Sequence, residues 1–166
     1  MLAVALIILG LITRLIIHIP NVTPILAIAL FGGVYLKKRT ALWMPITLMI
    51  ISDFIIGFHP TLFFTWASIL LITGIGMLLK SKLSTKNSVI TAIGSSVLFF
   101  VVTNFGVWIS TAMYAKNLTG LVECYTLGIP FFTNTLISTL VYTVVLFGSY
   151  EFLAKRMKHL AFAEAL

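Results

Sequence analysis

Six apolar segments, joined by short polar connections, fill most of the sequence. They cover residues 2–19, 24–36, 41–58, 62–79, 89–114 and 130–153. A helix needs about 20 residues to cross a hydrocarbon core of about 30 Å, and only the second segment is short for this. Since 60% of all residues are hydrophobic and 9% are charged, we predict an all-α integral membrane protein. It would have six transmembrane helices in one domain over residues 1–166.

The basic residues indicate how these helices are oriented. Nine of the eleven Lys and Arg fall in three clusters, at 37–39, 80–86 and 155–158, which follow every second apolar segment. The positive-inside rule places such clusters in the cytoplasm, so both termini are predicted inside. The clusters lack interleaved stacking aromatics, and we therefore expect no nucleic-acid partner. The predicted outer loops are 18–23, 59–61 and 115–129, the last marked as a loop by Gly120, Gly128 and Pro130.

Polar residues of four predicted helices all lie in the outer half of the bilayer. Arg14 and Asp53 each lie twelve residues from the inner end of their segments, about 18 Å into the bilayer at 1.5 Å per residue. Asn104 and Asn134 come out at about 22 and 24 Å on the same scale. A charged side chain near mid-bilayer costs roughly 2.5–3.5 kcal/mol, so it usually has a partner or a task. Because these polar residues lie in the outer half of the bilayer, they predict a pocket that opens to the outside.

Arg14 and Asp53 allow two interpretations, which can coexist. Arg14 and His18 are four residues apart and share a helix face, where the guanidinium could clamp an anionic or carbonyl-rich ligand. Alternatively, Arg14 pairs with Asp53 and only holds the first and third helices together. Asp53 and His59 could also serve as acid and base, but no nucleophile or H-E-x-x-H motif accompanies them. We therefore predict no enzyme, with no catalytic residue, metal site or cofactor.

The later polar residues have structural alternatives as well. Asn104 needs several hydrogen-bond partners at this depth, from a neighbour or from a ligand. Trp108 is either an interfacial aromatic or a stacking surface for a ligand. Cys124 is either a small apolar residue or a soft ligand for a metal-centred substrate, together with His18 or His59.

Four groups of residues carry a family resemblance. They are Arg14, His18 to Asn21, Thr23 and Pro24; Ser52, Asp53 and Gly57 to His59; Thr103 to Trp108; and Cys124, Tyr125, Pro130 to Phe132, Asn134 and Thr135. The series resembles an uncharacterised bacterial membrane family related to the substrate-binding S components of energy-coupling factor (ECF) vitamin transporters. The resemblance implies an S-component-like fold in the bacterial cytoplasmic (inner) membrane. It also implies capture of a vitamin or similar micronutrient, with a transmembrane coupling protein and two ATPases as partners.

The leading hypothesis is therefore a substrate-capturing component with its pocket in the outer half of the bilayer. The residues predicted to line this pocket are Arg14, His18, Asn21, Asp53, His59, Asn104, Trp108, Cys124, Tyr125, Phe131 and Asn134. A cobalamin-type corrinoid is one candidate substrate, because Cys124, His18 and His59 suit a cobalt centre. The alternative is a scaffolding protein similar to small cell-shape membrane proteins, in which the polar cluster locks helices together.

Overall fold

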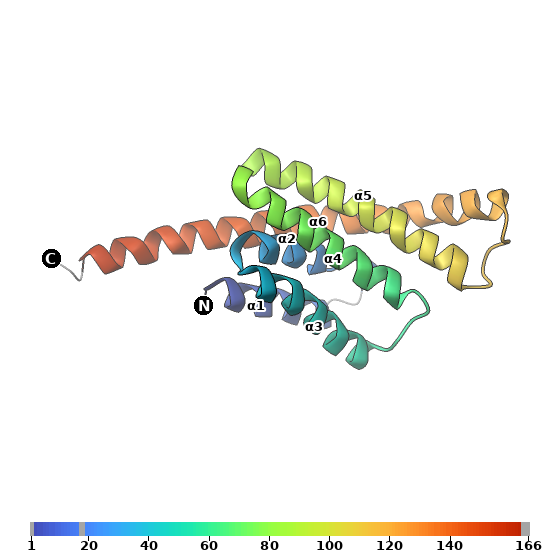
Figure 1. Cartoon of the computed structure of the whole chain (residues 1–166), viewed down its shortest axis with the longest axis horizontal. Coiled ribbons are helices and arrows are strands. Elements are labelled where there is room, and N and C mark those ends of the chain that lie inside the picture. The colour runs from blue at the N-terminus through green and yellow to red at the C-terminus, as the bar shows by residue number, and fades with distance from the viewer. Residues whose placement is uncertain (1, 17–18, 164–166) are drawn as a thin grey trace.

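The computed structural model describes residues 2–16 and 19–163. In these residues, all the regular secondary structure is helical. The helices are α1 (Leu2–Ile16), α2 (Ile25–Tyr35), α3 (Lys38–Ile56), α4 (Leu62–Leu79), the short η1 (Lys80–Lys82), α5 (Thr85–Ser110) and α6 (Leu118–Ala163). They form an elongated bundle in which α1 begins and α6 ends at the same end (Figure 1). The all-α prediction is confirmed for these residues.

Among the described residues, three stretches are long and apolar enough to cross a membrane: Leu62–Lys82, Thr85–Ser110 and Leu118–Met157. Their length and composition are those of a membrane-embedded protein. α1 and α2 are shorter apolar helices. At 11 residues, α2 is about 16 Å long, half the thickness of a hydrocarbon core.

The short helix α2 forms the centre of the bundle. Its residues 25–34 are all buried, and it contacts α1, α3, α4, α5 and α6. A helix that is apolar on every side is expected in such a position. Two glycines permit close packing here: a Cβ at Gly33 would overlap the Thr73 carbonyl oxygen, and one at Gly76 would overlap the Leu30 carbonyl oxygen. The backbones of α2 and α4 therefore touch.

The predicted loop at 115–129 is wrong, because α6 already begins at Leu118 and continues through Pro130. The two glycines taken as loop markers serve close contacts instead. A Cβ at Gly120 would overlap the Ala115 carbonyl, and one at Gly128 would lie 2.5 Å from Asn104 Oδ1 on α5. Proline is tolerated inside membrane helices when neighbouring groups satisfy the freed backbone. The 46 residues of α6 extend for about 69 Å, well past the bundle (Figure 1).

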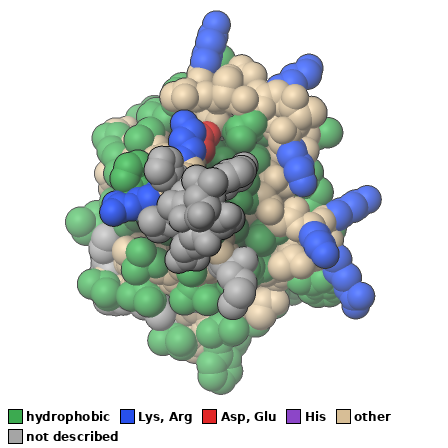
Figure 2. All heavy atoms as spheres, turned by 90° about the vertical axis from the view of Figure 1, so that its left-hand side faces the viewer, with side chains coloured by type: hydrophobic (Ala, Val, Ile, Leu, Met, Phe, Trp, Pro, Cys, Tyr) green, Lys and Arg blue, Asp and Glu red, His purple; other side chains and the backbone are tan. Residues whose placement is uncertain are grey.

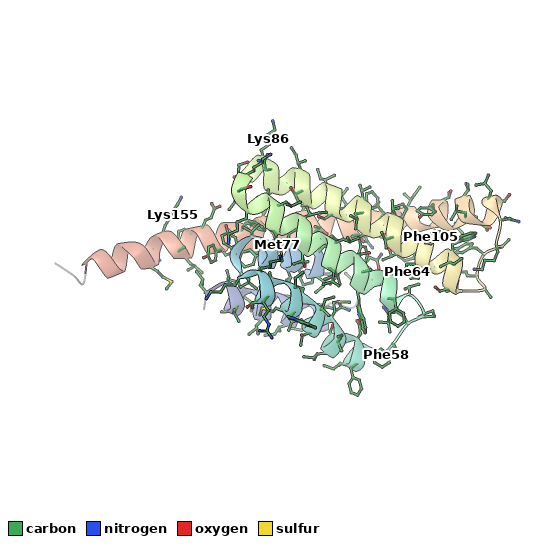
Figure 3. The ribbon with its side chains drawn as sticks, in the orientation of Figure 1. Phe58, Phe64, Met77, Lys86, Phe105 and Lys155 are labelled. Atoms are coloured by element: carbon green, nitrogen blue, oxygen red, sulfur yellow. The ribbon has the colours of Figure 1, made fainter. Side chains whose placement is uncertain are left out.

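The three basic clusters gather at one end of the bundle, as their spacing in the sequence predicts. The clusters lie at the start of α3, at the α4–α5 connection and near the end of α6, and their described side chains are exposed. Figure 2 shows Lys and Arg side chains spread around this end. In Figure 3, Lys86 and Lys155 lie toward the basic end, and Phe58 lies toward the other.

Candidate functional site

A cavity of about 590 Å³ opens at the end of the bundle opposite the three basic clusters. It is bounded by the C-terminal halves of α1, α3 and α5, the starts of α2 and α4, the connections that precede α2 and α4, and one residue of α6. The lining residues are Arg14, Ile19, Asn21, Val22, Thr23, Ile25, Met49, His59, Thr61, Thr65, Phe99, Thr103, Asn104, Val107 and Phe131. Pockets for small organic ligands usually measure 300–1,000 Å³, so this cavity has a suitable size.

An ion pair lies at the inner wall of the cavity. Arg14 Nη2 donates to Asp53 Oδ1 at 2.7 Å, and Trp66 Nε1 donates to Asp53 Oδ2 at 2.9 Å. Arg14 Nη1 also donates to Met49 Sδ. Asp53 is 2% exposed, and both of its oxygens are used, so its burial is compensated. The predicted Arg14–Asp53 pair is confirmed, and Trp66 extends the link to α4.

The polar groups nearer the mouth come from loops and from α5. His59 Nδ1 lies 2.9 Å from Thr61 Oγ1 in the connection between α3 and α4, and both residues line the cavity. Asn104 Nδ2 donates to the Phe100 carbonyl oxygen at 2.8 Å, and its Oδ1 faces Gly128 of α6. Asn104 therefore has one internal partner and a side chain at the cavity wall.

The segment before α2 is held in place by α6. Asn134 Nδ2 donates to the Pro20 carbonyl oxygen at 3.0 Å, and Ser138 Oγ donates to the Asn21 carbonyl oxygen at 3.4 Å. Asn21 has a positive φ of 59°, which Asn tolerates better than most residues. Asn134 thus positions the cavity wall from behind and does not line it.

The structure brings together five of the predicted pocket residues: Arg14, Asn21, His59, Asn104 and Phe131. His18 lies outside the described residues.

Asp53 and Asn134 support the wall, whereas Trp108, Cys124 and Tyr125 do not line the cavity. Cys124 is 1% exposed with its Sγ 3.4 Å from the Asn104 carbonyl oxygen, and the Tyr125 hydroxyl donates to the Val101 carbonyl oxygen at 2.7 Å. These two residues pack against α5 because their segment is helical. Trp108 Nε1 donates to the Ala115 carbonyl oxygen at 2.9 Å, in the α5–α6 turn.

The cobalt ligand set suggested by the sequence is not assembled in the described part of the chain. His59 lines the cavity, but Cys124 is buried between α5 and α6. Across the described residues, no three His, Cys, Asp or Glu side chains are grouped as a metal site would require.

Sequence reasoning did not identify several lining residues. These are the hydroxyls of Thr23, Thr61 and Thr65 and the apolar side chains of Met49 and Phe99. Thr65 and Thr103 donate to backbone carbonyls one turn earlier, at 3.3 and 2.7 Å, as hydroxyls in membrane helices commonly do. Such a pattern in the sequence does not distinguish a cavity residue from a packing residue.

A family model described as "Family of unknown function (DUF6580)" matches residues 1–161, and the chain therefore belongs to this family. No curated protein and no solved structure matches the chain significantly. The cavity is thus the basis for assigning a function.

Proposed function

We propose that this protein is a substrate-capturing membrane component, similar to the S components of ECF transporters. It binds a vitamin or similar small micronutrient from the outer side for uptake across the bacterial cytoplasmic membrane. The observation that carries the proposal is the cavity of about 590 Å³, with polar side chains at the end opposite the basic residues.

The chemistry of the wall supports a ligand site. Asn21, His59 and Asn104 offer amide and imidazole groups, while Phe99 and Phe131 offer apolar surface. A mostly apolar pocket with a few placed polar groups is the usual arrangement for small-molecule binding. Polar side chains at membrane depth are costly unless they bind something or one another.

A scaffolding role is the second candidate, and one observation favours it. The Arg14–Asp53–Trp66 network joins α1, α3 and α4 and uses both oxygens of Asp53 without any ligand. A protein that only locks its helices together would need this network. It would not need the open cavity beside it.

Ligand release from the purified protein tests the proposal. We expect mass spectrometry to detect a small molecule released from gently purified protein. Asn104→Ala should reduce the retained amount roughly two- to tenfold, as for the loss of one hydrogen bond of about 0.5–1.5 kcal/mol. Thr133→Ala is the matched control, because Thr133 is exposed on α6 and its hydroxyl bonds only to its own helix. Visible absorption of the released material tests the corrinoid candidate.

The same experiment can favour the scaffold. If the wild-type protein releases no small molecule and Asn104→Ala fails to fold, Asn104 acts in packing and the transport proposal is wrong.

The proposed orientation, with both termini and the basic end in the cytoplasm, predicts a labelling pattern. In intact cells, a membrane-impermeant maleimide should label a Thr119→Cys variant, and it should label a Lys86→Cys variant only after permeabilisation. Both positions are exposed, at opposite ends of the bundle. The unmodified protein is the control, since Cys124 is 1% exposed and should stay unlabelled. The reverse pattern would mean that the cavity faces the cytoplasm.

A further inference from the structure

We infer that the ligand of this cavity carries an oxyanion, a carboxylate or phosphate group, that binds at Arg14. This inference rests on the proposed function, because it names the chemical class of the molecule that the cavity takes.

The formal charges at the wall favour an anion over a cation. Arg14 is the one Lys or Arg among the described lining residues, which include no Asp or Glu. The nearby carboxylate of Asp53 is not available to a ligand, because it is buried behind Arg14 and accepts from Arg14 and Trp66. A cationic ligand would therefore meet the guanidinium of Arg14 and could not contact its counter-charge, the buried Asp53.

Arg14 still has donors for a ligand. Its guanidinium carries five N–H groups, and its bonds to the described residues use one on each Nη, toward Asp53 and Met49. The guanidinium donates to Oδ1 of Asp53, whereas Oδ2 accepts from Trp66 Nε1. The side chain is 14% exposed and lines the cavity, so the remaining donors can reach an oxyanion there.

The start of α2 adds to the same preference. Ile25 is both the first residue of α2 and part of the cavity wall, so the positive end of the helix dipole lies at the cavity. The N-cap residue, Pro24, offers no side-chain acceptor, and the Ile25 amide reaches Thr23 Oγ1 only at 3.4 Å. Helix N-termini favour anions for this reason. At this cavity, the helix dipole of α2 adds to the attraction that the positive charge of Arg14 exerts on an anion.

The remaining wall limits the rest of the ligand. Phe99 and Phe131 provide apolar contact, and Asn21 and Asn104 provide amide groups. An organic acid with a ring or similar apolar body satisfies both kinds of surface.

Two measurements on the full-length protein in lipid nanodiscs test this inference. The first is the charge at pH 7 of any molecule that the protein releases. The second is equilibrium dialysis with three matched probes: naphthalene-2-carboxylate, its uncharged carboxamide and naphthalen-2-ylmethylammonium. We expect an anionic released molecule, and tightest binding of the carboxylate by roughly tenfold over the carboxamide, with the ammonium weakest.

The variants assign the preference to Arg14. Arg14→Gln should remove the tenfold preference for the carboxylate over the carboxamide. Because this variant leaves Asp53 buried without its partner, the double variant Arg14→Gln/Asp53→Asn provides a second test in which neither charge remains. Arg14→Lys should restore part of the preference, since Lys keeps the charge and loses the planar fork.

The outcomes distinguish failure of the anion inference from failure of the proposed function. A released cation or neutral molecule, or equal binding of carboxylate and carboxamide, overturns the inference and leaves the binding function standing. A preference that survives in the double variant also overturns it. If nothing is released and no probe binds the wild-type protein, the proposed function fails as well.

Discussion

The Asp53→Asn variant is expected to lose about 3 kcal/mol of its free energy of unfolding. Removing one member of a buried ion pair typically costs 3–5 kcal/mol, because the other charge is left without compensation. The lower end of that range applies here because Arg14 is 14% exposed at the cavity. The new amide can still accept from Trp66 Nε1 but cannot balance the guanidinium. Denaturant unfolding in mixed micelles, followed by tryptophan fluorescence, measures the difference.

Two further variants make this result specific. Glu151→Gln also removes one negative charge, but Glu151 is exposed on α6, so we expect a change within about 0.5 kcal/mol. The double variant Arg14→Met/Asp53→Leu should recover much of the loss, because apolar residues can replace a buried pair at little cost. If Asp53→Asn unfolds at the wild-type denaturant concentration, the pair does not hold α1 to α3.

The Arg14–Asp53 contact could be predicted because depth in a membrane is set by simple quantities. The basic clusters mark one end of the predicted helices, and the constant helical rise places every residue relative to that end. Residues at equal depth on different helices can then be compared without any knowledge of the fold. The same reasoning located Asn104 and His59 near the mouth of the cavity.

Depth does not give the rotation of a helix about its own axis. The predictions therefore did not identify which face of each helix points into the cavity. Trp66 was missed as the second partner of Asp53, and Cys124 and Tyr125 were placed in the pocket although they face α5. Helices that are apolar on all sides give little information on which face meets which neighbour. The loop predicted around Gly120 and Gly128 failed because glycine also permits close helix contact, and local sequence does not separate the two uses.

Replacing Gly76 by alanine should give the other large effect, a loss of about 1–3 kcal/mol or more of the free energy of unfolding. A Cβ at this position would overlap the Leu30 carbonyl oxygen, which is backbone and cannot rotate away. α2 and α4 must then separate, and the movement reaches the cavity because α2 begins at its wall. Ligand retention should therefore fall together with stability.

Gly74→Ala is the matched control on the same helix, two residues away. A Cβ there meets nothing within 4 Å, so the variant should gain up to about 1 kcal/mol from the better helix propensity of alanine. Gly33→Ala should resemble Gly76→Ala, and the double variant should cost less than the sum, since both alanines open the same interface. Equal stability of Gly76→Ala and Gly74→Ala, measured by denaturant unfolding, would show that the α2–α4 backbone contact does not limit the fold.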